Sequence, residues 1–200
     1  MRIIGGSARG RRLQTPSKST AKFPPQLIRP TADRAREALF SIIGQEIKDA
    51  TVLDLYAGTG ALGLEALSRS AKQVVFVDNN PQALKLIEKN IELCGFSDRT
   101  LVMKRDLSKG LYFLVKQLPE IRFSVIFIDA PYRKGLSETM LHEIEKINLL
   151  SSDVLVAIEE EALSELPSKV TDLNLVDQRR YGDTGFWFYR RTQPGNKSIE

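Results

Sequence analysis

The sequence has little of the chemistry that builds metal centres or covalent crosslinks. Its 200 residues include one cysteine, Cys94, and one histidine, His142. A single cysteine excludes an internal disulfide and any metal site built on several cysteines. Cys94 continues the apolar helical spacing of Ile87 and Ile91, which predicts a buried structural thiol. His142 falls in an expected amphipathic helix, where a surface position is favoured over a ligand role.

Long apolar segments are also lacking. No run approaches the roughly 18 residues that a membrane span requires, and the first residues form no signal-peptide pattern. We therefore expect a cytoplasmic protein with no membrane partner. The length of 200 residues suits one α/β domain with a small extension, and we expect a monomer.

Positive charge is concentrated at one end of the chain. The net charge is +4, but residues 1–36 carry nine Lys or Arg against one Asp, whereas residues 37–200 carry 20 against 24 acids. A basic arm on a nearly neutral domain suggests a polyanionic partner. The alternative is a solubilising tail.

The pattern of elements predicts three segments. Residues 1–28 form a basic N-terminal hairpin and arm, 29–191 a single domain, and 192–200 a polar tail. Within the domain, strands are expected near 51–55, 73–78, 100–103, 123–129 and 154–159, followed by a hairpin of 173–181 and 186–190. Helices are expected near 33–47, 61–69, 81–94, 107–117, 135–147 and 161–165. This alternation predicts a parallel sheet with helices on both faces.

A glycine-rich turn follows the first of these strands. Gly58, Gly60 and Gly63 spell G-x-G-x-x-G at a strand-to-helix junction, where glycine lets a ligand approach the backbone. Taken alone, the pattern fits either a nicotinamide cofactor or S-adenosylmethionine.

Acidic residues at the strand ends favour the second cofactor. Asp54 lies four residues before Gly58, where a carboxylate suits the cationic amino-acid part of S-adenosylmethionine and would repel a pyrophosphate. Asp78 is placed to accept hydrogen bonds from ribose hydroxyls, and Asp106 from the adenine amino group. The alternative role for each acid is to cap the helix that follows it.

A second motif, Asp129-Ala130-Pro131-Tyr132, ends the strand near 123–129. The amino group of a base is a poor nucleophile, because its lone pair is delocalised into the ring. The Asp129 carboxylate and the Ala130 carbonyl could accept its hydrogens, Pro131 would stiffen the turn, and Tyr132 could stack on a flipped base. The alternative is an ordinary strand exit with an aromatic anchor.

These motifs, in this order, resemble class I S-adenosylmethionine-dependent methyltransferases that act on exocyclic amino groups. The catalytic motif of that group is D/N-P-P-Y/F, and Ala130 departs from it. Three further segments, I-I-G-G-S-A-R-G-R-R-L (3–13), R-P-T-A-D-R-A-R-E-A-L-F (29–40) and Y-G-D-T-G-F-W-F-Y-R-R (181–191), narrow the resemblance to the RsmD family. Those bacterial enzymes methylate N2 of one guanine in 16S ribosomal RNA.

The resemblance implies an α/β, Rossmann-like class I methyltransferase fold. It has a seven-stranded, mostly parallel sheet with an antiparallel last strand, plus an N-terminal β-hairpin extension. The implied partner is 16S ribosomal RNA, the small ribosomal subunit or an assembly intermediate. The implied catalytic residues are Asp129, Ala130, Pro131 and Tyr132. The implied S-adenosyl-L-methionine site comprises Asp54, Tyr56, Gly58, Gly60, Gly63, Asp78, Asn79, Asp106, Leu107 and Thr31. The implied RNA-binding residues are Arg2, Arg9, Arg11 and Arg12.

Other functions share parts of this pattern. A methyltransferase acting on exocyclic amino groups of DNA or of another RNA would share the catalytic motif. A nicotinamide oxidoreductase would share the glycine turn but leave the Asp129 motif without a role. A non-catalytic RNA-binding domain would need the basic arm and no glycine turn.

Overall fold

The computed structural model describes residues 1–16, 30–131 and 135–191, without the side chains of residues 30–32. The α-helices are α1 (Pro30–Ile43), α2 (Ala61–Ser68), α3 (Pro81–Cys94), α4 (Tyr112–Gln117) and α5 (Leu136–Lys146). Three short 3-10 helices are η1 (Gly44–Ile47), η2 (Ser97–Arg99) and η3 (Leu107–Lys109). The strands are β1 (Thr51–Leu55), β2 (Gln73–Asp78), β3 (Thr100–Lys104), β4 (Phe123–Ile128), β5 (Leu150–Glu161), β6 (Lys169–Val170), β7 (Leu173–Tyr181) and β8 (Thr184–Arg191).

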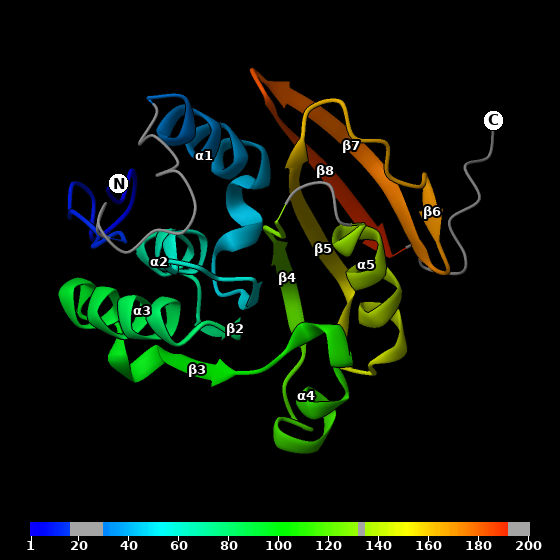
Figure 1. Cartoon of the computed structure of the whole chain (residues 1–200), viewed down its shortest axis with the longest axis horizontal. Coiled ribbons are helices and arrows are strands. Elements are labelled where there is room, and N and C mark those ends of the chain that lie inside the picture. The colour runs from blue at the N-terminus through cyan, green and yellow to red at the C-terminus, as the bar shows by residue number, and fades with distance from the viewer. Residues whose placement is uncertain (17–29, 132–134, 192–200) are drawn as a thin grey trace.

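All of the described strands form one sheet in the order β3-β2-β1-β4-β5-β8-β7-β6 (Figure 1). The five strands from β3 to β5 run parallel, whereas β8 pairs antiparallel with both β5 and β7. The direction of winding reverses between β1 and β4. In sheets of this kind, ligands bind beyond the carboxyl ends of the strands at that reversal.

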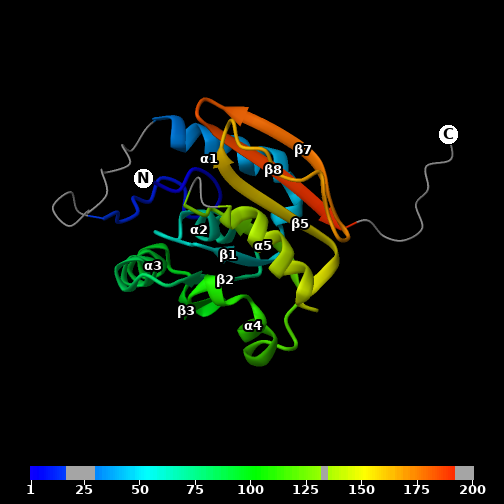
Figure 2. The ribbon, with the colours of Figure 1, turned by 45° about the vertical axis from the view of Figure 1, so that its right-hand side comes forward.

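Two apolar layers cover the two faces of the sheet. One layer packs α1, α2 and α3 against it, and the other packs α4 and α5 against the opposite face. Figure 2 shows α5 in front of the sheet and α1 behind it. The central strands are buried on both faces, so they are continuous apolar runs with little alternation.

The α/β class, the parallel sheet and the antiparallel last strand are confirmed, but the strand count of seven is wrong. The eighth strand, β6, has two residues and pairs with β7 at the edge of the sheet. Two residues are too few for any hydrophobic pattern to be visible in the sequence.

Two helix predictions are also wrong. The helix expected near 161–165 does not form, because Glu160 and Glu161 extend β5 by pairing with Gly185 and Thr184 of β8. The helix expected near 107–117 is divided into η3 and α4. The division falls at Gly110, whose φ of 78° is incompatible with a continuous helix.

The N-terminal segment folds back on itself and packs on α2 and α3 (Figure 1). Its hairpin is reduced to one bridge between Arg2 and Arg12, and Ile3, Ala8 and Leu13 belong to the core under α1–α3. The buried carboxylate of Glu65 accepts hydrogen bonds from the amides of Ile4 at 2.7 Å and Gly5 at 2.8 Å. The first 16 residues are therefore attached to the domain by apolar packing in a shared core and by hydrogen bonds to Glu65.

Candidate active site

The ends of β1, β4 and β5 meet at the reversal point of the sheet. Leu55 of β1 is level with Ile128 of β4, which is level with Ile158 of β5. Asp129 therefore follows β4 between its two neighbouring strands, and its amide lies 3.4 Å from the Leu55 carbonyl. This is the edge at which an α/β sheet binds ligands.

The loop between β1 and α2 has an unusual backbone. Tyr56, Gly58 and Gly60 have φ values of 59°, 57° and 75°, a left-handed region that is costly for residues with a Cβ. A Cβ on Gly58 would meet only the Tyr56 carbonyl, at 3.8 Å, so the backbone there is open to a ligand. Such a conformation at a tyrosine commonly marks a functional loop.

Two carboxylates hold this loop in place. Asp78 Oδ2 accepts a hydrogen bond from the Gly58 amide at 2.9 Å, and Asp54 Oδ2 accepts one from the Gly63 amide at 3.0 Å. Asp54 thereby satisfies an amide in the first turn of α2, which is the capping role considered as an alternative. Each carboxylate retains lone pairs for a further donor.

Asp54 is an acid in an apolar environment. Its side chain is 1% exposed, and burial raises its pKa to about 8. The hydrogen bond from Gly63 opposes this shift, and the charge of Asp78 adds to it. A nearby cation would stabilise the ionised form.

Asp129 stands beside further carboxylates. Loss of solvation raises its pKa well above the ordinary value, and the charges of Glu159, Asp54 and Glu160 raise it further. The Asp129 side chain nevertheless keeps solvent-exposed surface, so water screens part of this repulsion. These groups form an acceptor-rich edge, which suits a ligand that presents several N–H donors.

The other expected site residues are placed unequally. In the catalytic motif, Ala130 is buried and Pro131 exposed, while Tyr132 lies outside the described residues. Thr31 is in the first turn of α1, but its side chain is not among those described.

The remaining cofactor positions surround the ends of β2 and β3. Asn79 is exposed, whereas Leu107 is buried. Asp106 is exposed and accepts hydrogen bonds from Ser108 N at 3.1 Å and Ser108 Oγ at 2.7 Å, which lower its pKa. Burial raises the pKa of Tyr56, and so does the charge of Asp106, which places Tyr56 near Asp106.

The hairpin arginines differ in their contacts. Arg2 Nε lies 3.6 Å from Asp33 Oδ2. Arg11 Nη1 donates a hydrogen bond to the Leu93 carbonyl at the end of α3. Arg9 and Arg12 are exposed, and neither has an ion-pair partner within the described ranges. Lys18 and Lys22, further along the arm, lie outside those ranges.

Three polar residues important to this region were missed by sequence reasoning. They are Glu65, which anchors the hairpin, Glu159, and Asn90, which is fully buried. Asn90 alone carried a signal, because it interrupts the apolar stripe formed by Ile87, Ile91 and Cys94 in α3. Cys94 is buried and His142 exposed, as predicted.

Gly63 is expected to be irreplaceable for steric reasons. Alanine in a helix normally stabilises it by about 0.5–1 kcal/mol relative to glycine. A Cβ on Gly63, however, would lie 2.7 Å from both Phe76 Cζ and Val74 Cγ1, and overpacking of this kind costs about 1–3 kcal/mol. We expect Gly63→Ala to lower the free energy of unfolding in urea titrations. A stability gain would show that α2 does not press on β2 this closely.

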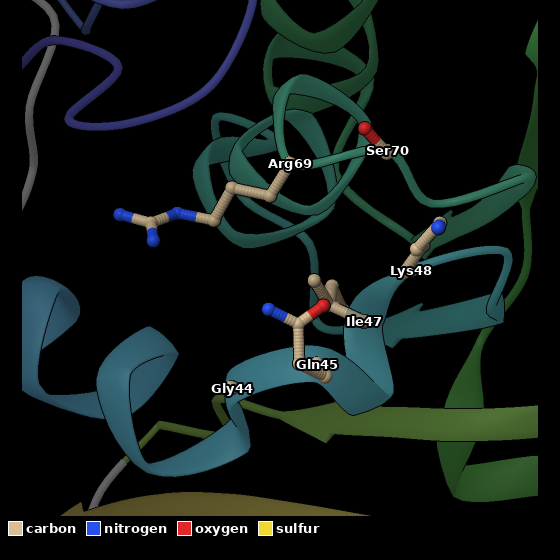
Figure 3. A pocket seen from close by; sticks show the side chains of 6 residues that line it. All are labelled: Gly44, Gln45, Ile47, Lys48, Arg69 and Ser70. Carbon is tan, nitrogen blue, oxygen red and sulfur yellow. The ribbon is translucent and has the colours of Figure 1, made fainter.

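A hollow elsewhere on the surface is a weaker candidate. It measures about 230 Å³ and is lined by Gly44, Gln45, Ile47, Lys48, Arg69 and Ser70 (Figure 3). It lies where β1 and β2 begin, so it is at the wrong edge of the sheet for a ligand site. Its volume is below the roughly 300 Å³ at which small-molecule pockets begin.

The ranges that the structure describes hold no cluster of three or more His, Cys, Asp or Glu residues suited to a metal ion. No helix within them is long and apolar enough to cross a membrane.

Comparisons with known proteins agree with this geometry. The family described as "Conserved hypothetical protein 95" matches residues 1–190. Ribosomal RNA small subunit methyltransferase D of Escherichia coli strain K12 is 31% identical over 200 residues, covering 100% of this chain and 94% of that protein.

Solved structures share the same fold. The structure of yhhF from Escherichia coli superimposes with a TM-score of 0.78 at 31% identity, covering 96% of this chain and 97% of that one. An RNA methyltransferase from Salinibacter ruber, solved in complex with S-adenosyl-L-homocysteine, has a TM-score of 0.58 at 11% identity, covering 84% of this chain and 96% of that one. The family match over residues 1–190 and the 31% identity along the whole chain show that this chain belongs to the RsmD family of methyltransferases.

Proposed function

We propose that this chain transfers a methyl group from S-adenosyl-L-methionine to the exocyclic N2 of a guanine in 16S ribosomal RNA. The observation that carries this proposal is the position of Asp129, which follows β4 at the reversal point, one strand away from the glycine loop. A nicotinamide cofactor is set aside, because the family is one of methyltransferases.

The residues present fit the cofactor. The open backbone at Gly58 allows close approach, Asp54 offers an acid to the ammonium group, and Asp78 offers acceptors to the ribose. Asp106, Asn79, Tyr56 and Leu107 border the adenine end. When bound, S-adenosyl-L-methionine supplies the electrophilic methyl group.

The cluster of hydrogen-bond acceptors at the strand ends also fits guanine. Its Watson–Crick edge presents N1–H and N2–H donors side by side, whereas adenine presents a donor beside an acceptor. The Asp129 carboxylate and the Ala130 carbonyl are proposed to accept the N2 hydrogens and to aim the nitrogen lone pair, while Tyr132 stacks on the base. Such positioning can contribute about 7–11 kcal/mol to the lowering of the barrier.

The N-terminal arm is the proposed RNA contact. Arg2, Arg9, Arg11 and Arg12 lie in one short hairpin, and phosphate groups are the ligands that such a cluster attracts. The substrate would be 16S RNA, the small subunit or an assembly intermediate, met by a monomer in the cytoplasm.

Cofactor binding is expected to release a proton from Asp54. An acid whose folded pKa is raised to about 8 is mostly protonated at pH 7, and its stabilising contribution to the fold is lost as the pH rises toward 8. A bound ammonium group would hold it ionised. Binding at pH 7 should therefore release most of one proton, and affinity should rise with pH up to about 8.

Calorimetry in two buffers of different ionisation enthalpy measures this proton. Asp54→Asn is the matched control, since it keeps the shape and the acceptor for Gly63 but cannot ionise. Equal proton release by both proteins would place the titrating group elsewhere.

Mapping of methylated nucleotides tests the proposed reaction. Bacterial 16S RNA, isolated small subunits and assembly intermediates, each lacking the modification, would be incubated with the chain and the methyl donor. We expect N2-methylguanine at one position in at least one of them. Methylation at an adenine or cytosine, or only of DNA, would contradict the proposal.

A further inference from the structure

Asn90 uses its whole side chain in one buried junction. It is 0% exposed, and its Oδ1 accepts a hydrogen bond from the Gln14 amide at 2.7 Å. Its Nδ2 donates to the Gln14 carbonyl at 3.1 Å and to the Thr59 carbonyl at 2.9 Å. One donor and two acceptors around the group fix its orientation, and no polar atom of the amide is left without a partner.

The two partners of Asn90 belong to different parts of the proposed machinery. Gln14 follows the arginine hairpin by two residues, whereas Thr59 lies between Gly58 and Gly60 of the cofactor loop. A second contact joins the same parts, since Thr59 Oγ1 lies 3.5 Å from Met1 Sδ. The hairpin and the cofactor loop are therefore neighbours, although the sequence assigns them to different segments, 1–28 and 29–191.

The Thr59 carbonyl belongs to the peptide unit that leads into Gly60. Fixing it helps to hold Gly60 at its left-handed φ of 75°, from which α2 begins. The rest of the loop is held by Asp78 at Gly58 and by Asp54 at Gly63. Asn90 is the side chain that holds the middle of the loop.

We propose that Asn90 is a positioning residue that couples the docked hairpin to the cofactor loop. With the hairpin docked, Asn90 is oriented by Gln14 and presents its second N–H to Thr59. RNA that orders the hairpin should then tighten cofactor binding, and by thermodynamic reciprocity the cofactor should tighten RNA binding by the same factor. The RNA part of this inference rests on the proposed function, whereas the effect on the loop does not.

The test compares two ways of loosening the hairpin. Asn90→Leu keeps the side-chain shape but removes all three hydrogen bonds. Ser68→Ala is the control: Ser68 Oγ accepts from the Ala8 amide at 2.9 Å and donates to the Gly5 carbonyl at 2.5 Å, and it touches the hairpin but not the cofactor loop. Affinity for S-adenosyl-L-homocysteine without RNA, and the melting temperature, are measured for each protein.

Both variants should melt below the wild-type temperature. We expect Asn90→Leu to weaken S-adenosyl-L-homocysteine binding about tenfold or more, which lies within the usual range of coupling between sites, while Ser68→Ala stays within about threefold of wild type. In the presence of RNA, only the Asn90 variant should lose the mutual tightening of the two ligands.

Equal affinity in wild type and Asn90→Leu would overturn the inference, as would equal weakening by Ser68→Ala. If Asn90→Leu does not fold, Gln14→Pro decides, because it removes the amide N–H that donates to Asn90 Oδ1 and keeps the Gln14 carbonyl that accepts from Asn90 Nδ2. Unchanged cofactor affinity in that variant would also overturn it. Absence of S-adenosyl-L-homocysteine binding by the wild-type chain would instead contradict the proposed function, and this inference with it.

Discussion

Asp129→Ala should remove nearly all methyl transfer while leaving the affinity for S-adenosyl-L-homocysteine within a few fold of wild type. Asp129 is proposed to contact the target amino group, and its contact strengthens as positive charge develops on that nitrogen. Removing one such charge-directed contact costs on the order of 10²–10³ in rate. The measurement is single-turnover methylation of the mapped 16S guanine, together with calorimetric titration of the cofactor.

The fold should not suffer from the same change. An acid whose folded pKa is raised contributes most to the stability of the fold below its ordinary pKa, and that contribution is lost as the pH rises from there through the folded pKa. Loss of solvation and the charges of Glu159, Asp54 and Glu160 raise the pKa of Asp129 in this way. We therefore expect the melting temperature of Asp129→Ala near neutral pH to equal or exceed that of wild type, a common result of removing a functional charge.

Asp153→Ala is the matched control. It removes an exposed acid near the beginning of β5, at the opposite end of the sheet from Asp129, and should methylate like wild type. Near wild-type turnover by Asp129→Ala would refute the role of this carboxylate. A parallel loss of cofactor affinity would assign Asp129 to the cofactor and not to the base.

The sequence predicts the fold well where local pattern decides it. The apolar runs ending in Asp54, Asp78 and Asp129 are strands, because segments buried on both faces of a parallel sheet need continuous apolar residues. The helix expected near 161–165 fails for a different reason, because partners distant in the sequence decide the structure there. The acidic end of β5 is held in a strand by pairing with β8, and no local signal marks that pairing.

The same limit applies to the candidate site. The glycine positions and strand-end acids follow from a short motif, but the residues that attach the N-terminal hairpin to the domain do not. Asn90 bonds to Gln14 across 76 positions, and Glu65 bonds to Ile4 across 61. The left-handed backbone of Tyr56 could not be predicted from the sequence for another reason. A glycine in a sequence can indicate a positive φ, whereas a tyrosine does not.

Replacing Arg9, Arg11 and Arg12 with alanine should flatten the salt dependence of RNA binding. These residues are proposed to contact phosphates and not bases, because the described part of the hairpin offers no aromatic platform for stacking. Each phosphate contact releases counterions and contributes roughly −0.7 to −0.9 to the slope of log affinity against log salt. The triple variant should therefore lose about two or three units of slope. Arg11 should account for the smallest part of this loss, because its side chain already donates to the Leu93 carbonyl.

The measurement is affinity for the 16S RNA substrate at several salt concentrations. The control is a second triple variant, Lys116→Ala, Arg122→Ala and Lys169→Ala. All three cations are exposed and lie outside the hairpin, so their replacement removes the same charge and should leave the slope unchanged. Cofactor affinity without RNA should be unaffected in both proteins, because no side chain of the three arginines takes part in the contacts among Gln14, Asn90 and Thr59. If the slope stays the same in the arginine variant, the hairpin does not contact the phosphates. The RNA-binding surface would then have to lie at the carboxyl edge of the sheet. The coupling through Asn90 would then not link RNA binding to cofactor binding.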